Sequence, residues 1–81
     1  MQDSNFKLGK YKHYKGKFYE VIGIAKHTET GEKLVLYKAL YDCPDLLEEY
    51  GADPVFARPY SMFFETVKAN GKEVSRFEFV G

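Results

Sequence analysis

The sequence contains a single cysteine, no long apolar run and no net charge. The lone Cys43 excludes an intramolecular disulfide and favours a reducing compartment. No apolar run approaches the roughly 18 residues of a membrane-spanning helix. The N-terminal residues also lack the apolar segment of a signal peptide. We therefore expect a cytoplasmic protein without membrane contact.

Residues for metal binding or covalent catalysis are also scarce. His13, His27 and Cys43 lack the short spacing that is typical of metal ligands. Cys43 could act as a nucleophile with one of the histidines as its base. The simpler explanation of Cys43 is that it is a small residue preceding a helix. The glycines near the N-terminus are isolated, so they form no phosphate-binding loop. The sequence predicts a protein that is not an enzyme and has no cofactor or metal.

The composition is that of one small globular domain. The 81 residues include seven phenylalanines and seven tyrosines, enough apolar surface for one core. We expect residues 1–81 to form a single domain, with the polar residues 1–5 as a disordered tail.

Charge is distributed unevenly along the chain. Residues 1–41 hold eight lysines and four acids, a charge of +4, whereas residues 42–81 hold four bases and eight acids, a charge of −4. This asymmetry could steer a charged partner, unless the two halves interleave in space and neutralise each other.

Residues 18–41 carry the strongest strand signal. Two runs of β-branched and aromatic residues flank a polar, glycine-containing loop at 28–32, which predicts a hairpin. A three-residue loop, 29–31, would place Ala25 opposite Val35. We assign the uncharged face of this hairpin to the core, because an unpaired buried charge is costly. The residues predicted to be mostly buried are Val21, Ala25, Val35, Tyr37 and Ala39.

A second hairpin is predicted within residues 63–80. Its turn is Asn70-Gly71, a pair that favours the two-residue turn in which both positions have positive φ. The implied register places Glu65 opposite Arg76, so that opposite charges meet across the ladder.

The remaining segments complete a mainly β protein. Residues 9–14 alternate like an edge strand, and residues 42–54 form an inserted loop with one short helix, whose apolar Leu46, Leu47 and Tyr50 would face the body. Five or six short antiparallel strands indicate a small closed or nearly closed β-barrel, with a two-layer sheet as the alternative.

Several fragments occur in an order and spacing typical of one protein family. They are His13-Tyr14-Lys15-Gly16, residues 25–32, Leu40-Tyr41, Arg58-Pro59, Met62-Phe63 and Arg76-Phe77. From about residue 9 to 80, the chain resembles the small bacterial family of domain of unknown function 1653. This resemblance implies an SH3-like β-barrel of five or six strands, and it implies no activity. The chain departs from the family pattern at Phe56, where tryptophan is usual, and in its longer segment 42–54.

Residues 7–17 suggest one possible function, binding of nucleic acid. Five lysines interleave with tyrosines there, and such a strand could pair with phosphates and stack on bases. Alternatively, the lysines are solvated and the tyrosines belong to the core. The zero net charge argues against nucleic acid as the partner.

A second candidate is an anion site. Two guanidinium groups at one rim of a barrel would each bind a carboxylate or phosphate through two parallel hydrogen bonds. Their positive charge would keep neighbouring histidines neutral. Tyr14, Tyr37 and Tyr60 would form the walls of this site. The candidate ligand-binding residues are His13, Tyr14, His27, Arg58 and Arg76. The structural alternative is that Arg76 only pairs with Glu65 and each histidine bonds to the backbone. We expect a non-enzymatic binding or accessory module for an anionic small molecule or acidic peptide, with its partner unknown.

Overall fold

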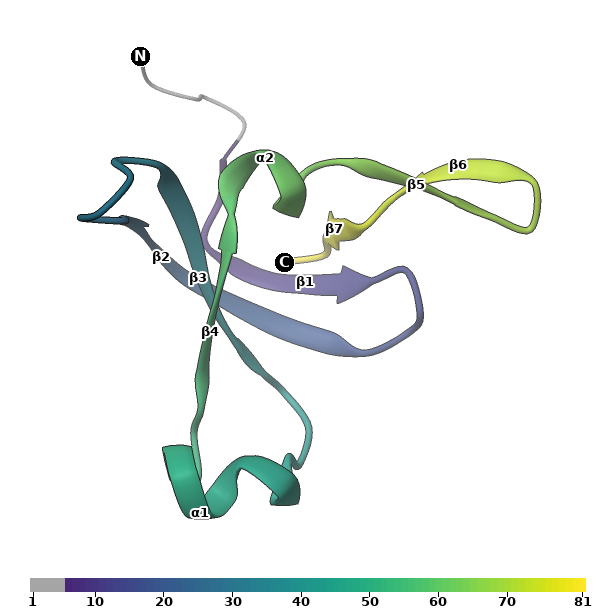
Figure 1. The fold of residues 1–81 in the computed structure, drawn as a ribbon. Helices are drawn as coiled ribbons and strands as arrows, with labels where there is room; N and C mark the ends of the chain where they lie inside the picture. The colour runs from purple at the N-terminus through teal and green to yellow at the C-terminus, as the bar shows by residue number, and fades with distance from the viewer. Residues whose placement is uncertain (1–5) are drawn as a thin grey trace.

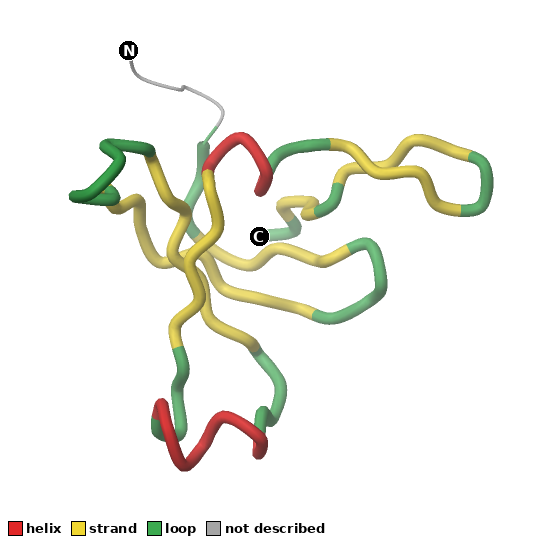
Figure 2. Tube along the Cα trace, in the orientation of Figure 1, coloured by secondary structure: helices red, strands yellow, loops and turns green. Residues whose placement is uncertain are grey.

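A computed structural model describes residues 6–81; the predicted tail, residues 1–5, lies outside them. Five strands form one antiparallel sheet in the order β4-β3-β2-β1-β7, and β5 and β6 form a separate hairpin (Figures 1 and 2). The strands are β1 (Gly9–His13), β2 (Phe18–Lys26), β3 (Lys33–Ala39), β4 (Val55–Pro59), β5 (Thr66–Ala69), β6 (Lys72–Ser75) and β7 (Phe77–Phe79). We call the β5–β6 hairpin the arm, because it extends away from the five-stranded sheet (Figure 2).

The mainly β class with antiparallel pairing is confirmed, but the predicted barrel is not closed. Strands β4 and β7 are the two outer strands, and within residues 6–81 no ladder joins them. Strand β1 was expected at an edge; instead it lies between β2 and β7. The chain returns from the arm to pair Phe77 with His13, and a pairing so distant in sequence leaves no local signal in residues 9–14.

The core face of the β2–β3 hairpin is as predicted, whereas its register is wrong. The loop holds four residues, because the His27 amide donates to the Glu32 carbonyl at 2.8 Å. A β-bulge between Val21 and Gly23 shifts the pairing once more, and Val21 faces Tyr37. Val21, Val35 and Tyr37 are buried, while Ala25 and Ala39 are half-buried.

The core is largely aromatic. Its buried side chains are Tyr11, Val21, Val35, Tyr37, Phe63 and Phe77. The short helix α2 (Tyr60–Phe63) follows β4 at the predicted turn and places Phe63 on Phe77, with stacked rings 4.1 Å apart. The described residues therefore close their core with α2, whose Phe63 packs on Phe77 at the inner face of the sheet.

The predicted arm turn is confirmed. Asn70 and Gly71 both have positive φ, 54° and 78°, and Ala69 faces Lys72. The arm is shorter than predicted at its base, because residues 60–63 are helical and Phe77 pairs with β1.

Replacing Asn70 with valine should destabilise the domain by about 1 kcal/mol or more, since a β-branched residue resists positive φ. Chemical denaturation of wild type, Asn70→Val and Asn70→Gly would measure it. Glycine tolerates positive φ, so Asn70→Gly should stay close to wild type. Equal stability of the valine variant would contradict the turn geometry.

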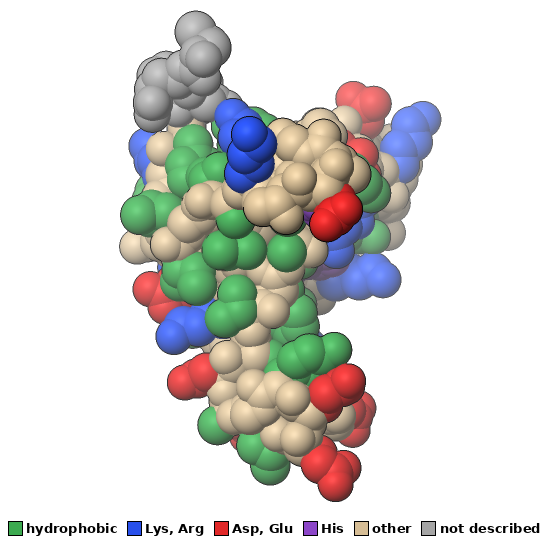
Figure 3. Space-filling model, turned by 60° about the vertical axis from the view of Figure 1, so that its left-hand side comes forward, with side chains coloured by type: hydrophobic (Ala, Val, Ile, Leu, Met, Phe, Trp, Pro, Cys, Tyr) green, Lys and Arg blue, Asp and Glu red, His purple; other side chains and the backbone are tan. Residues whose placement is uncertain are grey.

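The segment 42–54 contains a 3₁₀ turn, η1 (Pro44–Leu46), and α1 (Leu47–Tyr50), so the helix is confirmed. Its predicted orientation is wrong, because Leu47 and Tyr50 are 56% and 59% exposed. A four-residue helix has no continuous face to bury, and the segment projects from the sheet (Figure 1). Figure 3 shows acidic side chains gathered at this lower end. The acids of the segment are Asp42, Asp45, Glu48, Glu49 and Asp53. On this face of the molecule, acidic side chains therefore lie together at the end that the segment forms.

Candidate functional site

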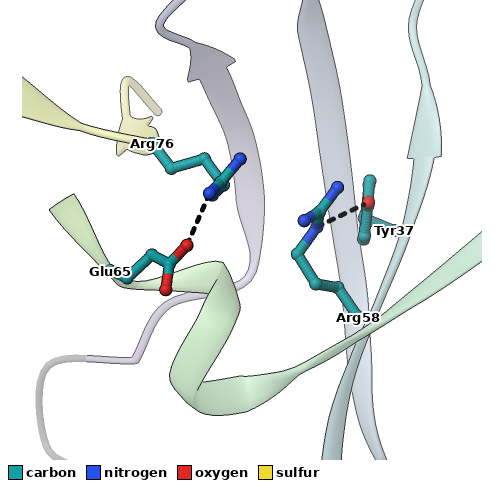
Figure 4. A network of polar contacts seen from close by, with 4 residues as sticks. All are labelled: Tyr37, Arg58, Glu65 and Arg76. Carbon is teal, nitrogen blue, oxygen red and sulfur yellow. Dashed lines mark hydrogen bonds and ion pairs between the residues drawn. The ribbon is translucent and has the colours of Figure 1, made fainter. Parts of the chain in front are cut away.

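The two arginines of the chain approach one position, beside His13. Arg58 lies on β4 opposite Val35, whose side chain is fully buried, so Arg58 is on the core side of the sheet. Arg76 lies in the link between β6 and β7. Figure 4 shows both guanidinium groups extending into the space between these two elements. The charges of both arginines lower the pKa of His13, in keeping with this arrangement.

Arg76 is partly neutralised. Its Nη2 donates to the Glu65 carboxylate at 2.5 Å, the pairing that the hairpin register predicted (Figure 4). Its Nε is buried and has no hydrogen-bond partner among residues 6–81. An unsatisfied buried donor is uncommon in folded proteins, and because this N–H is closed off from solvent, an acceptor reaches it only if the surrounding side chains move.

Arg58 carries the free charge of the pair. Its Nε donates to the Tyr37 hydroxyl at 3.3 Å, and its guanidinium carbon lies 5.9 Å from the centre of the Phe77 ring. The only ion pair in residues 6–81 is Arg76–Glu65, so Arg58 has no carboxylate partner there. The half-buried Arg58 is thus held in place by aromatic side chains without being neutralised.

His13 lies between aromatic rings. Its ring meets Phe77 edge-on at 4.9 Å and Tyr14 at 4.7 Å, and its Nδ1 accepts a hydrogen bond from the Lys15 amide at 3.1 Å. Burial lowers the pKa of His13, and the charges of Arg76 and Arg58 lower it further. The imidazole is therefore neutral near pH 7.

This pKa shift predicts a pH dependence of stability. Unfolded His13 takes up a proton near its ordinary pKa of 6.5, whereas folded His13 does so only at lower pH. Between these values the unfolded chain binds more protons, so the free energy of unfolding should fall as the pH drops below about 6.5. Denaturation of wild type and His13→Asn at about pH 7.5 and about pH 5.5 would measure this. The variant should lose less stability; an equal loss would exclude His13 as the cause.

The structure does not bring His27 to His13. His27 lies in the β2–β3 loop, at the opposite end of the nine-residue strand β2 from His13 and the β1–β2 turn. Its Nδ1 accepts hydrogen bonds from the amides of Glu29 and Thr30, at 3.1 and 3.4 Å. These bonds order the loop, and the predicted shared rim is wrong for His27.

The predicted aromatic walls are only partly at this site. Tyr37 contacts Arg58, whereas Tyr60 packs against Phe6 and Phe64 and has the Lys33 ammonium 4.1 Å from its ring centre. Phe77 is a wall that the sequence analysis missed. The sequence did contain a signal for Phe77. The predicted hairpin register placed Arg76 opposite Glu65, and Phe77 directly follows Arg76 in the chain.

The stretch 7–17 is less suited to nucleic acid than its sequence suggested. Tyr11 is 2% exposed and its hydroxyl donates to the Lys7 carbonyl at 2.7 Å, so it cannot stack on a base. Lys10 and Lys12 are exposed and lie over the ring of Phe18, at 5.3 and 6.0 Å.

The candidate residues for metal and thiol chemistry do not come together in the described part of the chain. Residues 6–81 hold no group of three His, Cys, Asp or Glu side chains placed to bind a metal ion. Cys43 is half-buried and its Sγ lies 3.6 Å from the Tyr41 carbonyl. No helix within residues 6–81 is long and apolar enough to cross a membrane.

Residues 9–79 match the profile of one family, described as "Protein of unknown function (DUF1653)". The chain belongs to this family. A crystal structure of a DUF1653 protein from Bordetella bronchiseptica is 35% identical, with a TM-score of 0.82 over 95% of this chain and 90% of that one. No curated protein matches the chain. The family resemblance seen in the sequence is confirmed, and membership in DUF1653 brings no activity with it.

Proposed function

We propose that this DUF1653 domain is a non-enzymatic binding module that holds a carboxylate at Arg58 and Arg76. The observation that carries the proposal is the half-buried residue Arg58, whose guanidinium no carboxylate in residues 6–81 neutralises. A cation fixed in partly desolvated surroundings attracts an anion more strongly than one in open water. Its planar donors match a carboxylate in two parallel hydrogen bonds.

The charge count favours a single carboxylate. Arg58 and Arg76 contribute two positive charges, Glu65 removes one, and His13 is neutral near pH 7. The site therefore has a charge of about +1 and suits a monoanionic group, from a small organic acid or an acidic peptide side chain.

A nucleic acid lying along residues 7–17 is the second candidate. The exposed Lys10 and Lys12 support it, but the buried Tyr11 removes the interleaved stacking platform that single-strand binding needs. The arginine pair is the better supported site.

Titration of wild type and Arg58→Gln with acetate and with a tetraglutamate peptide tests the proposal. Hydrogen bonds to charged groups are worth about 1.5–3 kcal/mol, so loss of the guanidinium should weaken binding about tenfold or more. Thermal melting should show a small change, because glutamine keeps much of the side chain that packs near Phe77.

Lys68→Gln is the matched control, because it removes one positive charge from the exposed face of the arm. It should leave the affinity nearly unchanged. If Lys68→Gln weakens binding as much as Arg58→Gln does, the interaction is a general charge effect. Unchanged affinity in a folded Arg58→Gln would overturn the proposed site.

A further inference from the structure

A cleft of about 620 Å³ lies between the arm and the end of β1. One wall comes from β1 and β7 and the other from the arm, which extends beside the β1–β2 turn (Figures 1 and 2). The lining residues that bear on binding are Lys12, His13, Tyr14, Asn70, Lys72 and Ser75. The volume falls within the range of about 300–1,000 Å³ typical of small-molecule sites.

The wall on the sheet side offers an aromatic platform. The rings of His13 and Tyr14 lie 4.7 Å apart at an angle of 32°, which is nearer to stacking than to edge contact. Tyr14 is 36% exposed, and its backbone amide is fixed by a 2.9 Å bond to the Arg76 carbonyl. The Lys15 ammonium lies 5.9 Å from the centre of the Tyr14 ring. A planar ring that stacks on the exposed part of Tyr14 would therefore meet this ammonium as well.

Cations and free polar groups surround this platform. Lys12 comes from β1 and Lys72 from the arm, while Glu78, opposite Lys12, supplies one negative charge, so the lining has a net charge of +1. Within residues 6–81, the side chains of Asn70, Lys72 and Ser75 make no hydrogen bond or ion pair with other side chains or the backbone. Both lysines can approach one anion from opposite walls, and the neutral groups can meet the edge of a heterocycle.

We propose that this cleft binds a nucleoside phosphate, with the base on Tyr14, its edge at Asn70 and Ser75, and the phosphate between Lys12 and Lys72. Each part of such a ligand meets a matching group: a π-face, hydrogen-bond donors and acceptors, and ammonium groups. The site is distinct from the arginine pair and does not depend on the carboxylate proposal, although His13 borders both.

The test is a titration of the full chain, labelled with ¹⁵N, with adenosine 5′-monophosphate, adenosine and inorganic phosphate. The monophosphate should bind saturably and shift the amide signals of Tyr14, Asn70 and Ser75. Adenosine and phosphate alone should each bind about tenfold more weakly, since each lacks one of the two recognised parts. Equal binding of phosphate and nucleotide, or no shift at these residues, would overturn the proposal.

Variants separate this cleft from general charge effects and from the arginine site. Tyr14→Leu and Lys72→Gln should each weaken nucleotide binding about tenfold, whereas Lys68→Gln, on the same arm, should not. Circular dichroism of each variant shows whether it is folded. Arg58→Gln should leave nucleotide affinity unchanged while weakening acetate binding, which distinguishes the two proposals. An equal effect of Lys68→Gln and Lys72→Gln would contradict the cleft as the site.

A single-stranded oligonucleotide identifies the source of the nucleoside phosphate. If it binds through Tyr14 and Lys72 more tightly than the monophosphate does, the natural ligand is a strand. If the monophosphate binds as tightly, the ligand is a free nucleotide. Either result supports the cleft; binding of the oligonucleotide that Tyr14→Leu and Lys72→Gln leave unchanged would contradict it.

Discussion

Replacing Val21 with aspartate should leave most of the chain unfolded. Val21 is 1% exposed, in the centre of the sheet, where it faces Gly9 on β1 and Tyr37 on β3. A carboxylate there would have to be buried without a partner or protonated, and either should cost more than about 4 kcal/mol. That loss approaches the whole stability of a small domain, which is about 5–15 kcal/mol. Circular dichroism and a denaturant titration would measure the result.

The neighbouring residue provides the control. Ile22 is 42% exposed, and the same substitution there places the carboxylate in water. Ile22→Asp should fold and lose far less stability than Val21→Asp. Comparable losses in the two variants would contradict the assignment of the inner and outer faces of β2.

Replacing Phe77 with alanine should cost about 3–5 kcal/mol, the usual penalty for removing a buried phenylalanine. Phe77 is 4% exposed and stacks on Phe63 at 4.1 Å. Its ring also meets His13, Tyr19 and Tyr37 edge-on, so its loss leaves a cavity that several rigid rings cannot fill. The midpoint of urea unfolding should fall accordingly.

Phe79, two residues further along β7, is the matched control. It is 38% exposed, so Phe79→Ala removes the same atoms with less loss of burial. It should cost clearly less than Phe77→Ala. If the two variants were equally destabilised, the core would not be centred on the Phe63–Phe77 stack.

Features of the fold that depend on residues close together in the sequence could be predicted from the sequence. The Asn70-Gly71 turn follows from the backbone preferences of those two residues, and Pro44 and Gly51 mark the limits of the inserted helices. The inner face of the first hairpin follows from its lack of charge. Each of these signals is contained in a few consecutive residues, so distant contacts do not change it.

Features that depend on distant pairings could not be predicted in the same way. Period-two alternation identifies the faces of β2 and β3 but does not reveal a bulge between Val21 and Gly23 or choose between loops of three and four residues. The position of β1 inside the sheet depends on its pairing with β7, far away in sequence. Counting strands did not determine whether the sheet closes.

The same distinction applies to the candidate site. The pairing of Glu65 with Arg76 followed from the arm turn, which is a local feature. The approach of Arg58 depends on the register of β4 against β3, and no local signal sets it. Barrels gather loops at two rims, and on that ground the sequence grouped His27 with the other candidates; in the structure the full length of β2 separates His27 from His13.

The most direct test of the carboxylate site is an NMR titration with acetate that follows the arginine Nε–Hε signals. The chain has only two arginines, Arg58 and Arg76, so each signal reports on one half of the site. We predict that both signals shift saturably with one common dissociation constant, and that the Arg58 signal disappears in Arg58→Gln while the Arg76 shift shrinks. Sodium chloride is the control titration. An anion site at this pair would be contradicted if both signals stayed in place, or if acetate shifted them only linearly and by as much as sodium chloride does.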